Sequence, residues 1–223
     1  MASVIDDQSY DDCDIYTVAF RTAPIIITVT VTAIPSVVRN WLFRTLTVCR
    51  RYVRQQNFVV GLGVQWTPGH EESPPNTLQL CVGHRCLIFQ LDRANYVPIK
   101  LRRFLLDPSL TFVGFWNELD RRKLLSSKHR LEMVTDPLDL KRYAENDHGQ
   151  ILDQESVNEI VAESVGLEVD QRSEISTSDW DREELEHDQI VYAAVDAYCA
   201  FLFGKNIGAW RFNGVDECSV QRK

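Results

Sequence analysis

The sequence of 223 residues has no long hydrophobic segment and no net positive charge. Its longest nearly apolar run, residues 23–34, is about 12 residues long and is broken by three threonines, whereas a membrane-spanning helix needs about 20. Residues 1–14 are acidic and lack the apolar core of a secretory signal. The net charge of -8 excludes a polycation that coats nucleic acid in bulk. We therefore expect a soluble, intracellular protein of the nucleus or cytoplasm, with no membrane partner.

The sequence also lacks zinc-type cysteine spacing, internal repeats and low-complexity linkers. Its composition is 44% hydrophobic and 25% charged, which is typical of a globular domain and excludes collagen, coiled coil and disorder for the whole chain. Cys81 and Cys86 fall in two runs that we interpret as adjacent strands. We expect all six cysteines to be core thiols in a reducing compartment.

The hydrophobic pattern predicts one α/β domain with a mixed sheet. Alternating or continuous apolar runs predict strands at 16–20, 25–32, 58–66, 77–82, 85–90, 111–115 and 131–134. Helical periodicity and capping residues predict helices from Pro35, and at 98–106, 117–126, 136–146, 157–165 and 189–203. We expect a disordered acidic tail at 1–14, a domain at 15–207 that begins with a hairpin and helix at 15–54, and a C-terminal tail at 208–223.

Charge is distributed unevenly along this domain. Residues 100–130 contain eight Lys or Arg and three Asp or Glu, a net of +5. Residues 136–188 contain seventeen Asp or Glu and four Lys or Arg, a net of -13. The basic segment predicts either solvated helix faces or a rim that binds a nucleic-acid backbone. The rim would consist of Arg102, Arg103, Arg121, Arg122, Lys123 and Lys128. Trp116 could stack on a base, or pack on the sheet at the start of a helix.

The last predicted helix carries two residues with catalytic potential. Tyr192 and Asp196 are four positions apart and therefore lie on one helix face. A carboxylate in this place could hold a metal, and a phenol one turn earlier could orient a water molecule. Taken alone, the pair is a weak signal and favours an exposed acid and a packed tyrosine.

Several segments in order carry a stronger signal. They are residues 60–66 (VGLGVQW), 77–81 (TLQLC), 86–90 (CLIFQ), 112–124 (FVGFWNELDRRKL) and 178–198 (SDWDREELEHDQIVYAAVDAY). Together they resemble the motifs and hairpin of the DnaQ-like 3'-5' exonucleases, and in particular the Werner-syndrome-type exonuclease domain in the short stand-alone form common in plants. The resemblance extends over residues 16–207.

This resemblance implies an RNase H-like fold with a five-stranded central sheet and an N-terminal hairpin-plus-helix extension. Enzymes of this group use four carboxylates to hold two divalent metals, for which oxygen ligands favour Mg²⁺ or Mn²⁺. They remove nucleotides one at a time from a 3' end. By the resemblance, Asp120 and Asp196 are metal ligands and Tyr192 positions the attacking water. Val191 stands where other members carry a histidine, which indicates the tyrosine subclass.

The first motif departs from the family pattern. Its two carboxylate positions, two residues apart on one face of a strand, are occupied by Gly63 and Gln65. Losing one preorganised charged group costs on the order of 10²–10³ in rate, and two are missing here. We expect impaired or absent catalysis and weak metal affinity, with a single metal at Asp120 and Asp196 as one alternative. Substitute acids would be Glu71, Glu72 or Glu118.

Three functions remain open at this point. The first is an active two-metal exonuclease acting on DNA or RNA 3' ends. The second is a domain that binds a nucleic-acid 3' end with little or no catalysis, and this is the function we expect. The third is a non-catalytic scaffold that binds a partner protein or a second copy of itself.

Overall fold

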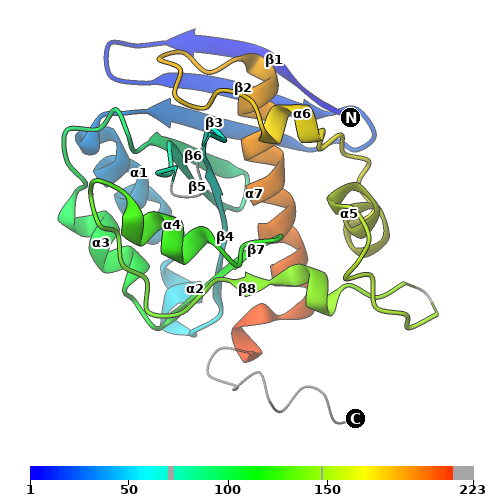
Figure 1. Cartoon of the computed structure of the whole chain (residues 1–223). Helices are drawn as coiled ribbons and strands as arrows, with labels where there is room; N and C mark the ends of the chain where they lie inside the picture. The colour runs from blue at the N-terminus through cyan, green and yellow to red at the C-terminus, as the bar shows by residue number, and fades with distance from the viewer. Residues whose placement is uncertain (70–72, 147, 213–223) are drawn as a thin grey trace.

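The computed structural model describes residues 1–69, 73–146 and 148–212, and within them one mixed sheet is flanked by helices on both faces (Figure 1). The strands are β1 (Ala2–Ser9), β2 (Asp14–Phe20), β3 (Ile26–Thr32), β4 (Phe58–Gln65), β5 (Thr77–Val82), β6 (Arg85–Gln90), β7 (Leu110–Gly114) and β8 (Leu138–Asp139). The helices are α1 (Pro35–Val48), α2 (Arg50–Arg54), α3 (Ile99–Leu105), α4 (Asp120–Ser126), α5 (Val157–Val165), α6 (Ser173–Ser176) and α7 (His187–Ile207). Short 3-10 turns span Leu140–Tyr143 and Ala209–Arg211.

The described residues form an eight-stranded sheet with the order β1-β2-β3-β6-β5-β4-β7-β8. The pairs β3/β6, β4/β7 and β7/β8 are parallel, and the other neighbours are antiparallel. The predicted mixed α/β architecture is confirmed. The expectation of a separate N-terminal extension beside a five-stranded sheet is corrected, because β1, β2 and β3 continue the same sheet beyond β6.

The prediction of a disordered tail at 1–14 is wrong. Residues 2–9 pair along their whole length with β2, from Ala2 opposite Phe20 to Ser9 opposite Asp14. Ala2 and Val4 also pack against the buried core. Of the five acidic side chains that suggested disorder, Asp6 and Asp7 lie on the exposed part of this edge strand, where charge is a common protection against edge-to-edge pairing.

Two predicted elements between β7 and α5 also differ. Residues 131–134 form no strand in the described structure, although Leu131 and Met133 are buried. The helix expected at 136–146 is replaced by β8 and a 3-10 turn, because Leu138–Asp139 pairs with β7. The Asp139 side chain then accepts the Lys141 N–H and caps the turn.

The last helix is longer than predicted at both ends. Glu186, rather than Asp188, caps α7, and the helix continues through Gly204 to end at Gly208, whose φ of 69° is left-handed. Gly204 serves a different purpose, since a Cβ there would lie 2.9 Å from the Val113 side chain. Beyond α7, part of the predicted tail forms a 3-10 turn, and residues 213–223 lie outside the described part of the chain.

The sheet separates two apolar clusters. Alternate residues of the central strands point to α7 on one face, and the intervening residues point to α1 and α3 on the other. Helix α7 comes very close to β4, because a Cβ at Gly61 would lie only 1.8 Å from the Ala197 carbonyl oxygen. Glycine is required at this contact because no larger residue leaves room for the helix backbone.

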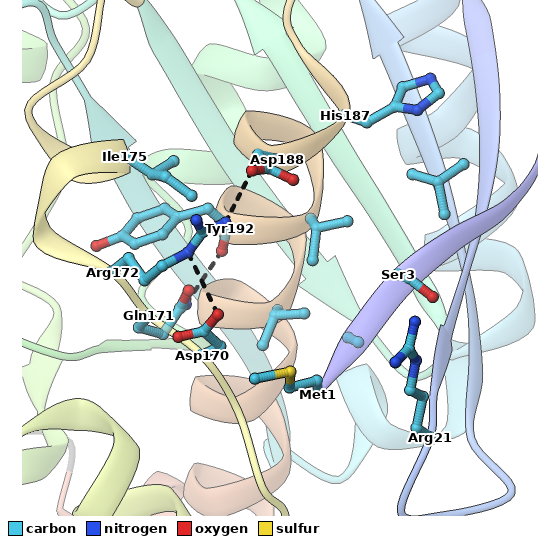
Figure 2. A pocket seen from close by; sticks show the side chains of 14 residues that line it. Met1, Ser3, Arg21, Asp170, Gln171, Arg172, Ile175, His187, Asp188 and Tyr192 are labelled. Carbon is cyan, nitrogen blue, oxygen red and sulfur yellow. Dashed lines mark hydrogen bonds and ion pairs between the residues drawn. The ribbon is translucent and has the colours of Figure 1, made fainter.

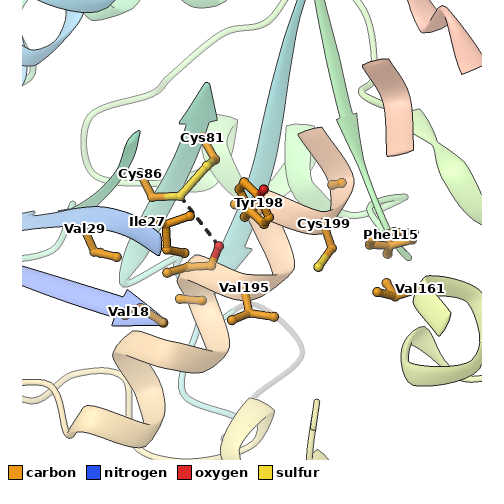
Figure 3. Close-up of a cluster of buried hydrophobic side chains, with 14 of the residues drawn as sticks. Val18, Ile27, Val29, Cys81, Cys86, Phe115, Val161, Val195, Tyr198 and Cys199 are labelled. Atoms are coloured by element: carbon orange, nitrogen blue, oxygen red, sulfur yellow. Dashed lines mark hydrogen bonds between the residues drawn. A yellow bond between two sulfur atoms is a disulfide. The ribbon is translucent and has the colours of Figure 1, made fainter. Parts of the chain in front are cut away.

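A disulfide crosses the β5–β6 hairpin inside the cluster that faces α7 (Figure 3). Cys81 and Cys86 are direct cross-strand partners with their Cα atoms 4.2 Å apart. The prediction of free thiols is therefore wrong for this pair. Cys13, Cys49 and Cys199 are free, and Cys218 lies outside the described residues.

Helix α7 also has a length and an apolar composition that would allow it to cross a membrane. The hydrophobic runs in the sequence did not predict this. About 56% of its apolar stretch is buried inside the fold. A buried core helix of a folded domain passes the same test, so this property alone is weak evidence for membrane insertion.

Replacing Gly61 by alanine tests the contact between β4 and α7. We expect Gly61→Ala to lower the free energy of unfolding by about 3 kcal/mol or more, because the new methyl group meets helix backbone that cannot move away. Gly63→Ala is the matched control on the same strand, since its Cβ would meet only side-chain ends, at 3.0 and 3.3 Å. Urea unfolding of both variants measures the difference. Equal losses would contradict the close contact.

Candidate active site

The first-motif positions face helix α7 across the centre of the sheet. Gly63 stands opposite Gln79 in the β4–β5 pairing. A Cβ at Gly63 would lie 3.0 Å from Gln79 Oε1 and 3.3 Å from Asp196 Oδ2. Gln65 is two residues further along β4 and so shares this face. The predicted common face of positions 63 and 65 therefore meets Asp196, but neither position supplies a carboxylate.

Asp120 is the first residue of α4 and is only 5% exposed. Its N–H donates to the Asn117 carbonyl at 3.0 Å. The turn after β7 therefore fixes the position of the Asp120 backbone, from which the carboxyl group projects. Burial raises the pKa of Asp120 well above its usual range, and the negative charges of Asp196 and Asp139 raise it further. The three carboxyl groups thus lie close enough to interact electrostatically.

Asp196 is half-buried on α7, and burial raises its pKa to about 7. The cause is desolvation, which disfavours the charged form of a carboxyl group. In a working metal centre the cations would have the opposite effect and hold the carboxylates ionised. Of the four carboxylates that the resemblance implies, the donor set retains Asp120 and Asp196.

Tyr192 lies one turn before Asp196 on the same helix. Its ring centroid is 6.3 Å from that of Trp180. Burial raises the pKa of the phenol, and the charge of Asp196 adds to this effect. Tyr192 also lines a cavity of about 320 Å³ between β1 and α7 (Figure 2). None of Gly63, Asp120 or Asp196 lines this cavity, so it is distinct from the carboxyl cluster.

The residues present do not fit a two-metal centre of four carboxylates. Within residues 1–69, 73–146 and 148–212, no three His, Cys, Asp or Glu side chains gather as metal ligands would. One neutral oxygen remains at the centre: Gln79 Oε1 is buried and has no hydrogen-bond partner among the described residues. The Gln79 amide nitrogen donates to Thr77 Oγ1 at 2.5 Å. The site has an orphaned acceptor and space at Gly63, but not the charge that two dications need.

The acids considered as substitutes do not change this result. The Glu118 carboxylate is exposed and pairs with Lys141 Nζ at 2.8 Å. Glu71 and Glu72 lie outside the described residues. Asp139, which sequence reasoning missed, is 6% exposed and uses Oδ1 to accept the N–H groups of Trp116 and Lys141.

Three of the six basic residues assigned to a backbone-binding rim form hydrogen bonds within the fold. Arg102 donates to the His129 and Arg130 carbonyls at 2.7 and 3.2 Å, and Lys128 Nζ donates to the Asp92 carbonyl. Lys123 is buried, with Nζ 2.7 Å from the Ser73 carbonyl oxygen and 4.7 Å from the Trp66 ring centroid.

The other members of the predicted rim lie on the surface. Arg121 Nη1 lies 3.7 Å from Asp136 Oδ2, and both side chains are exposed. Arg103 and Arg122 are exposed, and Trp116 is 39% exposed. These four and Lys128, which is also exposed, make five of the seven predicted nucleic-acid contacts accessible from solution in the described structure.

Two site residues had weak signals in the sequence. Gln79 is a polar residue with apolar Leu78 and Leu80 on either side in a buried strand, which marks a polar group aimed into the core. Asp139 follows Asp136-Pro137, which we had interpreted as the start of a helix. A buried strand beside β7 would have been the better interpretation.

Two curated proteins match the chain. The bifunctional 3'-5' exonuclease/ATP-dependent helicase WRN of Mus musculus is 28% identical over 155 residues, which is 67% of this chain and 11% of that protein. A putative 3'-5' exonuclease of Acanthamoeba polyphaga mimivirus is 25% identical over 174 residues, which is 74% of this chain and 42% of that protein. The chain thus spans less than half of either relative. No protein-family model matches it.

Solved structures share the fold. The EXO domain of Aedes aegypti Nibbler superposes with a TM-score of 0.60 at 14% identity, covering 81% of this chain and 87% of the other. Escherichia coli RNase D, an exoribonuclease, superposes with a TM-score of 0.55 at 20% identity, covering 74% of this chain and 41% of the other. These likenesses agree with the RNase H-like α/β architecture.

The order of the motifs, the fold and both curated relatives lead to one assignment. The similarity to two 3'-5' exonucleases and the shared fold support a DnaQ-like 3'-5' exonuclease domain of the Werner-syndrome type in this chain.

Proposed function

We propose that this exonuclease domain binds the 3' end of a nucleic-acid strand but no longer cleaves it. The observation that carries the proposal is the space at Gly63. The position of the first-motif aspartate faces Asp196 Oδ2 and Gln79 Oε1, and it carries no side chain. The fold around the site persists while half of its expected negative charge is absent.

Divalent metal affinity follows from the same donor set. Mg²⁺ and Mn²⁺ bind through several oxygen ligands, of which carboxylates supply the charge. Asp120 and Asp196 are the candidate ligands, with Gln65 and Gln79 as neutral oxygens beside them. Tyr192 is the residue that an enzyme of the tyrosine subclass would use to orient a water molecule. Weak binding of one cation is the most that this set supports.

Nucleic-acid binding depends on other groups. The exposed Arg103, Arg121 and Arg122 lie in the segment of net charge +5 and do not require a metal to contact phosphates. A second candidate function, a scaffold for a partner protein or a second copy, is favoured by exposed apolar side chains on α1 and α3. Phe43 is 60% exposed, Val48 77% and Ile99 67%.

Restoring the two missing carboxylates tests the loss of catalysis. We expect Gly63→Asp/Gln65→Glu to bind Mn²⁺ measurably by calorimetry and to shorten a 5'-labelled recessed duplex at least about 100-fold faster than the unmodified chain. The space at Gly63 admits the change, because the nearest atoms are the ends of flexible side chains. Adding Asp196→Ala to the restored variant should abolish both gains. Degradation by the unmodified chain that disappears in Asp196→Ala would refute the proposal.

The raised pKa of Asp196 gives a prediction about pH. The group keeps its proton to about pH 7 in the fold but only to about 4 when unfolded. Its contribution to stability is therefore complete below pH 4 and is lost as the pH rises to 7. In a chelator, Asp196→Asn should raise the free energy of unfolding at pH 8 by on the order of 2–4 kcal/mol, and the gain should vanish below pH 4. Asp188→Asn, an exposed acid on the same helix, is the control and should change stability by under about 1 kcal/mol. An increase in the free energy of unfolding that does not depend on pH would contradict desolvation of the Asp196 carboxylate as its cause.

Salt dependence separates nucleic-acid binding from the scaffold function. If about three phosphates are contacted, raising salt from about 50 to 200 mM should weaken single-strand binding roughly 20-fold in fluorescence anisotropy. Arg103→Ala and Arg122→Ala should each reduce this salt dependence. Arg39→Ala, an exposed arginine on α1 that lies outside the predicted rim, should not. If no strand binds even at low salt, the scaffold function is favoured instead.

A further inference from the structure

Trp116 has a backbone conformation that costs free energy. Its φ is 47°, in the left-handed region, where bulky side chains are rare. A strained residue of this kind persists only when its surroundings hold it, and such residues gather at functional sites. The question is what the tryptophan side chain provides here.

The surroundings hold the turn firmly. The Trp116 N–H donates to Asp139 Oδ1 at 3.3 Å, and the Asn117 side-chain amide donates to the Leu138 carbonyl at 3.2 Å. Both acceptors belong to β8, which pairs with β7 immediately before the turn. The turn is therefore tied to the sheet on each side of the tryptophan.

The indole ring is supported but not covered. Lys141 Nζ lies 5.5 Å from the ring centroid. Lys141 is itself fixed by Glu118 at 2.8 Å and by Asp139 at 3.5 Å. The residue nevertheless remains 39% exposed. An exposed aromatic plane that is already immobilised loses little conformational freedom when a ligand stacks on it.

The ring also lies beside the carboxyl cluster. Trp116 precedes Asp120 by four residues, and the intervening Asn117 carbonyl accepts the Asp120 N–H. Asp139, which holds the Trp116 backbone, is close enough to raise the pKa of Asp120. A group stacked on the ring would thus be adjacent to the place where the family performs its chemistry.

The charges around the ring limit what can bind. Lys141 already occupies a cation's place at the indole, which disfavours a cationic ligand. The acids Glu118, Asp139 and Asp120 disfavour a phosphate at the same spot. A flat, neutral group remains, and every nucleobase has such a face.

We propose that Trp116, supported by Lys141, is a stacking platform for the unpaired base at the 3' end of a nucleic-acid strand. This inference rests on the proposed function, because it assumes that the domain binds nucleic acid. It adds a subsite that reads the presence of a base and not its sequence, since stacking tolerates all four bases.

Two oligonucleotides that differ at one position test the platform. They are 5'-labelled single strands of equal length, one with an intact 3' nucleotide and one with an abasic 3' terminus. Fluorescence anisotropy should show that the protein prefers the intact strand by about 5- to 150-fold, the range of one stacked base. Trp116→Ala should remove this preference, and Trp116→Phe should keep most of it.

Two further variants separate binding from folding. Trp116→Gly should remove the preference while raising the melting temperature, because glycine accepts the left-handed backbone without strain. Phe43→Ala should leave the preference unchanged. Phe43 makes the same kind of contact, with Lys100 Nζ 4.9 Å from its ring centroid, but lies on α1 at the opposite face of the sheet from α7.

The outcomes are distinguishable. Equal affinity of the unmodified protein for both strands, or a preference that survives Trp116→Ala, would overturn the platform and leave the proposed function intact. No binding of either strand at low salt would overturn the proposed function and the platform together.

Discussion

The close approach of α7 to β4 is the contact on which the rest of the site depends. Gly61 lets the helix backbone meet the strand without an intervening side chain. Gly63 is two residues further along the strand and lies close to Asp196. Asp196 directly precedes Ala197, whose carbonyl oxygen contacts Gly61. The position of Asp196 over β4 therefore depends on this contact between α7 and Gly61. The site's geometry is therefore inherited from backbone packing and does not need the carboxylates to be maintained.

The electrostatic state of the site follows from that geometry. Asp120, Asp139 and Asp196 are brought together in low-dielectric surroundings, and only Asp139 has a cationic neighbour in the described structure. A carboxyl group in such surroundings avoids the free-energy cost of burying a charge by keeping its proton. The two missing first-motif carboxylates reduce the number of charged ligands, and burial favours the neutral form of Asp120 and Asp196, which remain.

Local sequence signals predicted the fold well where they were strongly periodic. The central strands, the β5–β6 hairpin and the end of α5 at Gly166 were all anticipated, because each has an unbroken apolar pattern or a left-handed glycine. β1 was missed, since its pairing with β2 outweighs a polar composition that indicates disorder. β8 was missed because two residues carry no periodicity. In the site, the shared face of positions 63 and 65 followed from strand geometry. The internal roles of Arg102 and Lys123 did not, since a basic residue that binds a backbone carbonyl within the fold looks the same in sequence as one that faces solvent.

The position of α7 along the chain has a consequence for how the protein is made. This helix supplies much of the apolar layer on one face of the sheet, yet it follows every strand in the sequence. During synthesis the strands can pair with one another, but that face stays open to water until residues 187–207 have left the ribosome. The nascent chain must therefore keep an apolar sheet surface from aggregating for most of its translation.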